Sequence, residues 1–217
     1  MKLIVGVLGI TALLVGCQET KQEDTEQRLP KLGNADINYA TGDTVYPTII
    51  PFEYLNQDSV MIASSDMKGK VWIADFFFTS CPTICPTMTT QMKRLAVMTE
   101  DLADEVQFMS FSINPTNDQP HVLKRYIKKH GIDAKNWYFF TGDEAATHVL
   151  GTEYFLIHAN SDEEAPGGYA HGPAFTLVDR SGYVRGVYDG TDTKQVDQLE
   201  KDLRQLLRQE YGVKWSN

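Results

Sequence analysis

Two cysteines separated by three residues are the feature of this sequence with the clearest chemistry. Cys81 and Cys85 lie in the segment TSCPTICP, residues 79–86. Two thiols this close can form a disulfide, for which the Cα atoms usually lie about 4.4–6.8 Å apart. They can also bind one soft metal ion together, or they can form an unreactive structural pair. The pair alone does not decide among these three possibilities.

The predicted elements on either side place the cysteines where the sites of α/β proteins gather. Residues 70–78, KVWIADFFF, form a nearly continuous apolar run that is typical of a buried strand. Residues 86–103 carry apolar side chains at helical spacing, and Pro86 suits a first helical turn. The cysteines therefore follow the carboxyl end of a strand. They also precede a helix amino terminus, which stabilises a thiolate.

The rest of the chain predicts one α/β domain from about residue 36 to residue 217. Strands are expected at 106–113, 137–140, 174–178 and 183–188, and helices at 119–130, 143–150 and 193–208. The last two strands flank a Ser-Gly turn and should form a hairpin. This order of elements indicates a central mixed sheet flanked by helices.

Composition excludes several classes of protein. The chain has 217 residues, 42% of them hydrophobic and 23% charged, which are ordinary values for a globular protein and exclude wholesale disorder, collagen and coiled coil. Its net charge of −9 argues against nucleic acid as a partner.

The amino terminus has the form of an export signal. Residues 3–15 are apolar, a run too short to cross a bilayer comfortably. The sequence LVGC ending at Cys17 resembles the bacterial lipoprotein signal, which implies a cleaved segment 1–16 and a lipid on Cys17. Residues 17–35 are mostly polar, so we expect a disordered tether. The domain would then be held at a membrane in the cell envelope, outside the cytoplasm; a buried strand and an uncleaved anchor are the alternatives.

Five histidines could add a ligand to the thiols: His121, His130, His148, His158 and His171. The first three belong to predicted polar helices, and His158 lies near an acidic stretch. His171 stands apart because it directly precedes Gly172-Pro173 and the strand at 174–178. Without a partner, each is more often a surface or packed side chain than a ligand.

The segment FFFTSCPTICPTM, residues 76–88, closely resembles the Sco (SenC) family of membrane-tethered copper proteins. The resemblance implies a thioredoxin-like fold and one copper, Cu(I) or Cu(II), bound by Cys81, Cys85 and His171. It also implies a metallochaperone that passes copper to the CuA subunit of cytochrome c oxidase. Two thiolates and a neutral imidazole are suitable copper ligands.

The thioredoxin-like resemblance implies roles for two further residues, and two other residues depart from the Sco pattern. Asp75 stands where thioredoxins carry a buried proton acceptor, and Pro173 where they carry a cis-proline facing the cysteines. Asn114 and Ala170 stand where Sco proteins usually or often have Asp. The change at Ala170 removes a negative charge beside the implied ligand histidine.

The alternative function is that of a thiol–disulfide oxidoreductase. Cys81 would attack a disulfide and Cys85 would resolve the mixed disulfide. Its substrates would be the cysteines of the CuA site or of other exported proteins. A peroxiredoxin-like peroxidase is a weaker third possibility, because no arginine can be placed with the cysteines from the sequence.

Overall fold

A fully buried strand forms the centre of the sheet. The structure, a computed structural model, describes residues 27–162 and 164–215. Seven strands pair in the order β11-β10-β5-β6-β7-β3-β4, with β5, β6 and β7 parallel and the other pairs antiparallel. Their bounds are β3 Glu53–Asn56, β4 Met61–Ala63, β5 Val71–Phe77, β6 Val106–Ser112, β7 Trp137–Thr141, β10 Ala174–Val178 and β11 Val184–Asp189. The predicted mixed sheet is confirmed.

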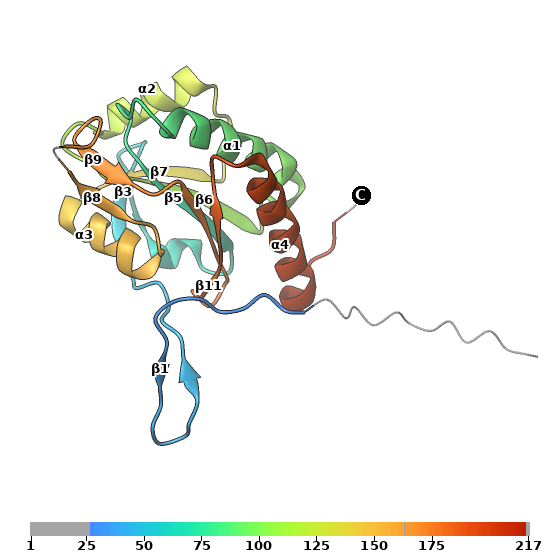
Figure 1. Ribbon diagram of the computed structural model, residues 1–217. Helices are drawn as coiled ribbons and strands as arrows, with labels where there is room; N and C mark the ends of the chain where they lie inside the picture. The colour runs from blue at the N-terminus through green and yellow to red at the C-terminus, as the bar shows by residue number, and fades with distance from the viewer. Residues whose placement is uncertain (1–26, 163, 216–217) are drawn as a thin grey trace, which may run out of the picture.

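Helices cover both faces of this sheet. The helices α1, α2 and α4 lie on one face and α3 on the other (Figure 1). The bounds of the helices and helical turns are α1 Cys85–Met98, α2 Pro120–His130, α3 Glu144–Val149, α4 Thr193–Tyr211, η1 Ser64–Met67, η2 Glu100–Leu102 and η3 Leu150–Tyr154. No helix within the described ranges combines the length and the apolar character needed to cross a membrane.

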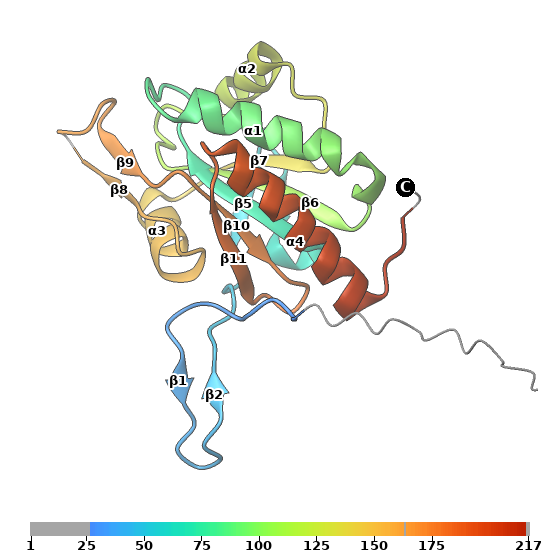
Figure 2. The same cartoon turned by 45° about the vertical axis from the view of Figure 1, so that its right-hand side comes forward.

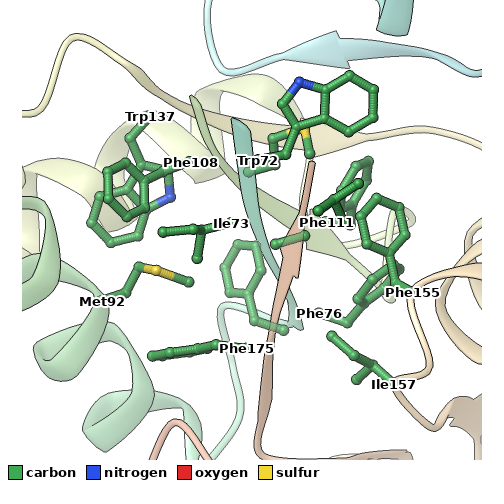
Figure 3. Packing of buried hydrophobic residues seen from close by; sticks show 14 of the residues in the cluster. Trp72, Ile73, Phe76, Met92, Phe108, Phe111, Trp137, Phe155, Ile157 and Phe175 are labelled. Carbon is green, nitrogen blue, oxygen red and sulfur yellow. The ribbon is translucent and has the colours of Figure 1, made fainter. Parts of the chain in front are cut away.

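The alternating side chains of β5 build a core on each face. Phe76 packs on Phe155 beside α3, with the ring centroids 5.7 Å apart. On the other face, Phe77 packs on Tyr126 of α2 at 5.4 Å. Figure 3 shows how side chains from the sheet and its covering elements meet in the core. Because β5 is buried from both sides, its end offers a rigid platform for the loop that follows.

The predicted helix at 86–103 is shorter in the structure. The helix α1 ends at Met98, and the chain continues through the 3-10 turn η2. Thr99 leaves the helical conformation with φ −113° and ψ 23°, while its hydroxyl donates to the carbonyl of Leu95 at 2.9 Å. The apolar spacing continues through Leu102, which is why the sequence pattern extends past the end of the helix.

Six short strands were not predicted. Two of them, β3 and β4, extend the main sheet beyond β7. The other four lie outside that sheet. They form two hairpins, β1 Asp36–Ile37 with β2 Thr44–Val45, and β8 Ala159–Ser161 with β9 Tyr169–His171. The first hairpin projects from the body of the domain (Figures 1 and 2). The second packs beside the cysteines and carries the predicted ligand histidine.

Several residues between 27 and 32, before the predicted domain boundary, contact the domain. Gln205 of α4 donates to the carbonyl of Gln27 at 2.8 Å, and Leu32 forms a bridge with Val184 of β11. Arg185 donates to the carbonyls of Leu29 and Pro30. The prediction of a disordered tether is therefore wrong for residues 27–32, because main-chain carbonyls find donors on the domain. The predicted signal 1–16, Cys17 and residues 18–26 lie outside the described residues.

Candidate metal centre

The topology of the sheet brings His171 to the cysteines across 90 residues of chain. The strand β10 is antiparallel to β5, with Thr176 opposite Ala74. The amino end of β10 therefore lies beside the carboxyl end of β5. His171 stands just before β10, and the loop 78–84 that contains Cys81 follows β5 directly. Cys85 is the first residue of α1.

The three side chains converge on one point. The Nε2 atom of His171 lies 3.0 Å from the Sγ of Cys85 and 3.9 Å from the Sγ of Cys81. The three ligand atoms all lie within 4.8 Å of one another. Both cysteines are free thiols. Among residues 27–162 and 164–215 this is the one group of three or more metal-ligating side chains found so close together.

Hydrogen bonding fixes the tautomer of His171. Its Nδ1 lies 3.1 Å from the carbonyl oxygen of Gly172, which can only accept, so Nδ1 carries the proton. The lone pair of Nε2 then faces the two thiols. Burial lowers the pKa of His171, and the Gly172 hydrogen bond offsets this only in part. The imidazole is therefore neutral at pH 7 and available as a ligand.

The surroundings of the two thiols shift their pKa values in opposite directions. Burial by itself raises the pKa of Cys81, but hydrogen bonds from the Cys85 thiol, from the backbone N–H groups of Thr83 and Cys85 and from the Thr83 hydroxyl bring it below the ordinary value. Burial and the Cys81 hydrogen bond raise the pKa of Cys85. Cys81 is thus the more easily ionised thiol.

Asp75 lies in β5 on the sheet face that α1 covers. Only 3% of the residue is exposed, and its Oδ1 has no hydrogen-bond partner. Burial raises its pKa to about 7, against a smaller lowering by Ser110, which is opposite it in β6. Asp75 also contributes to the raised pKa of Cys85. These properties suit a proton acceptor, and that role stays a prediction.

Pro173 is not a cis-proline. Every peptide bond in the described ranges is trans, so that prediction is wrong. Backbone hydrogen bonds fix the chain on both sides of Pro173. Gly172 donates to the carbonyl of His158 at 2.8 Å, and Gly190 donates to the carbonyl of Pro173 at 2.6 Å. Pro173 keeps its place between the histidine and β10.

The other four histidines lie away from this group. His121 and His158 are exposed. The ring of His130 packs at a tilt against Tyr126 with the ring centroids 4.3 Å apart, and Nε2 of His148 lies 3.3 Å from the carbonyl of Ile113. The structure therefore singles out His171.

The residues that support the site were not predicted from the sequence. Phe78 places its ring edge-on to His171, at 5.9 Å between centroids, and packs on Tyr169 at 5.5 Å. Asp118, in the loop after β6, binds the backbone of Thr79. The only signal for Asp118 is its place after a strand parallel to β5, since the carboxyl ends of parallel strands share one edge.

Fold and site together define a class of protein. The protein has an α/β fold with a thioredoxin-like sheet, and two free thiols and one imidazole lie together at the carboxyl end of the buried strand β5. Residues 41–208 match the family model SCO1/SenC, and the chain belongs to that family.

Similar proteins support this assignment along most of the chain. The SCO1 protein homolog of Bacillus subtilis is 32% identical over 71% of this chain and 80% of its own length. A crystal structure of a SCO1/SenC family lipoprotein from Bacillus anthracis is 35% identical, with a TM-score of 0.67 over 73% of this chain and 94% of that one. The structure of BsSco, described as a member of the Sco family of cytochrome c oxidase assembly proteins with a disulfide switch, is 29% identical, with a TM-score of 0.67 over 82% and 96%.

Proposed function

We propose that this protein binds one copper ion as cargo through Cys81, Cys85 and His171 and delivers it to the CuA subunit of cytochrome c oxidase. The observation that carries the proposal is the convergence of two sulfur atoms and a neutral imidazole nitrogen within 4.8 Å. Soft thiolates with imidazole are ligands that copper prefers. Membership of the SCO1/SenC family and the likeness to BsSco support the oxidase as recipient.

A copper titration of the reduced protein tests the binding step. We expect one copper per chain, no binding by Cys81→Ser/Cys85→Ser and a large loss of affinity in His171→Ala. His158→Ala is the matched control, because His158 is exposed and immediately precedes the strand that pairs with His171. Stoichiometric binding by the double serine variant would contradict the assignment.

Transfer is tested separately by mixing the copper-loaded protein with a soluble, metal-free CuA domain. Copper should move to that domain by exchange of ligands. If copper stays on the loaded protein while the CuA domain accepts copper from a small chelate, the delivery proposal is wrong, although the binding site stands.

The second candidate function is reduction of disulfides in exported proteins, the CuA cysteines among them. The lowered pKa of Cys81 and the raised pKa of Cys85 favour it, because they give one attacking and one resolving thiol. His171→Ala separates the two functions: it should weaken copper binding and leave disulfide reduction largely intact. Unchanged copper binding in His171→Ala would contradict the role of His171 as a ligand, and loss of disulfide reduction would show that the two functions do not separate at this residue.

We also propose that Cys17 carries a lipid that holds the domain at the outer face of a bacterial membrane. The export-type sequence of residues 1–17 supports this, and the Bacillus anthracis relative is described as a lipoprotein. Cys17→Ser should release the protein from the membrane fraction of the producing cells. Continued membrane association of that variant would exclude the lipid as the anchor.

A further inference from the structure

A buried carboxylate lies behind the loop that carries Cys81. Asp118 follows β6 and has no exposed surface. Its Oδ2 accepts hydrogen bonds from the Thr79 N–H at 2.9 Å and the Ser112 hydroxyl at 2.7 Å. Its Oδ1 accepts from the Thr79 hydroxyl at 2.5 Å and the Asn117 amide at 2.7 Å.

These four donors show why the position requires a carboxylate. No ion pair of Asp118 exists in the described ranges, so its charge is compensated by hydrogen bonds alone. A buried charge is tolerated only when its lone pairs are satisfied. An amide in the same place would turn an NH₂ group toward donors and leave some of them unpaired.

The turn before Asp118 is also built by hydrogen bonds. The backbone of Asn114 accepts from the N–H of Asp118 at 2.9 Å, and its own N–H donates to the Ser112 hydroxyl at 3.1 Å. Asn117 further donates to the Thr79 hydroxyl at 3.2 Å. The carboxylate is thus held rigidly against the carboxyl end of β6.

The two hydrogen bonds between Asp118 and Thr79 form a clamp that connects the buried carboxylate to the site. Thr79 lies two residues before Cys81 and directly after Phe78, whose ring contacts His171. The N–H of Cys81 donates to the carbonyl of Phe78 at 3.1 Å, so the backbone at Thr79 sets the direction of the loop. Fixing Thr79 therefore fixes Cys81 relative to His171.

We propose that Asp118 is the positioning residue of the metal centre: by clamping Thr79 to the end of β6, it holds Cys81 within reach of His171 and Cys85. The inference rests on the proposed copper function for its consequence, but the clamp itself is a property of the metal-free protein. Residues that orient ligands without touching the metal typically change metal affinity by about 10- to 100-fold when replaced. Asp118→Asn should weaken copper binding by a factor in that range.

A matched control separates positioning from general stability. Asp179 is also buried and accepts hydrogen bonds from the N–H groups of Ser181 and Tyr183 and from Arg185, but it lies beyond the opposite end of β10 from His171. Asp179→Asn should lower the thermal midpoint and leave copper affinity unchanged. Thr79→Val removes one hydroxyl donor to Asp118, and Thr79→Ser restores it. This pair keeps the test informative if Asp118→Asn does not fold.

The experiment combines amide hydrogen exchange on the reduced, metal-free protein with copper affinity measured by chelator competition. Asp118→Asn should speed exchange at Thr79 and through residues 80–84, and it should weaken copper binding at least tenfold. Thr79→Val should weaken binding less, with recovery in Thr79→Ser. If local exchange and copper affinity in Asp118→Asn or Thr79→Val match those in Asp179→Asn, the positioning role is wrong. If the unaltered protein binds no copper, the proposed function fails, while faster local exchange still supports the clamp and unchanged exchange overturns it.

Discussion

The two cysteines of the site have different surroundings, although only three residues separate them in the sequence. Cys81 and Cys85 belong to one motif, yet Cys81 receives hydrogen bonds that stabilise its thiolate, whereas Cys85 is almost completely buried and donates its one proton to Cys81. His171 directs the lone pair of Nε2 at both sulfur atoms. The site therefore holds one reactive thiol, one protected thiol and one neutral base.

Alkylation should distinguish the two thiols. With limiting iodoacetamide at neutral pH, Cys81 of the reduced protein should be modified first, because the thiolate is the reacting species. Cys85 should react only after unfolding. Peptide mass mapping measures the ratio, and equal modification of both cysteines in the folded protein would contradict this description.

Asp75 should make stability depend on pH. Burial raises the pKa of its carboxyl from 3.8 to about 7, so the folded state binds this proton more tightly than the unfolded chain. The protonated carboxyl of Asp75 contributes its full share to the free energy of unfolding below about pH 4. This contribution, on the order of 4 kcal/mol at most, is lost as the pH rises to about 7. Asp75→Asn should lack this loss.

Urea unfolding of the reduced, metal-free protein at pH 5 and pH 8 measures the effect. The relevant quantity is the difference between the two pH values, compared between the unaltered chain and Asp75→Asn. The same pH difference in both proteins would show that the carboxyl does not titrate in this range.

At the scale of elements, the β8–β9 hairpin supports the histidine. Gly167 lies in its loop at φ +90°, and a Cβ there would lie 2.7 Å from Phe78 and 3.6 Å from Pro82. The neighbouring Gly168 has φ +84° and nothing within 4 Å of such a Cβ. The two glycines thus share a strained backbone conformation, but only one packs on the loop with the thiols.

Alanine substitutions at these glycines form a matched pair. Gly168→Ala should cost only the left-handed strain, about 1–2 kcal/mol. Gly167→Ala should cost more and should also weaken copper binding, because the hairpin must move away from Phe78. Thermal melts and chelator competition measure the two effects. Equal copper affinities in the two variants would indicate that the hairpin does not position His171.

The longest elements could be predicted from the sequence, and the short strands could not. The continuous apolar run of β5 and the helical spacing in α1 and α4 are local patterns that burial on a sheet explains. The strands β1, β2, β8 and β9 have two or three residues each, and hairpin pairing alone defines them. The thiol pair is equally local, whereas His171 was predicted only through the family resemblance. Asp118 was missed because the partner that links it to the site, Thr79, lies 39 residues earlier in the chain.

At the scale of the whole molecule, the amino-terminal segment 27–32 is part of the domain. Arg185, almost fully buried, binds Asp179 at 2.9 Å and Glu210 at 2.5 Å and also holds the carbonyls of Leu29 and Pro30. Leu29 and Leu32 pack against the core. The domain therefore includes Gln27, which lies nine residues before the predicted domain boundary at residue 36.

Truncation tests this boundary. A chain that starts at Gln27 should be as stable as a longer one, whereas a chain that starts at Asn34 should lose on the order of 3 kcal/mol, since it removes apolar contacts and the carbonyls that Arg185 binds. Urea unfolding compares the two. Equal stability of both truncated chains would mean that the segment contributes nothing to the fold.

The central claim is that two sulfurs and one imidazole nitrogen bind copper, and X-ray absorption at the copper edge tests it most directly. The loaded, reduced protein should show two sulfur neighbours and one nitrogen neighbour, and His171→Ala should lose the nitrogen while keeping both sulfurs. A copper ion surrounded only by nitrogen and oxygen, or a spectrum unchanged by His171→Ala, would contradict the account.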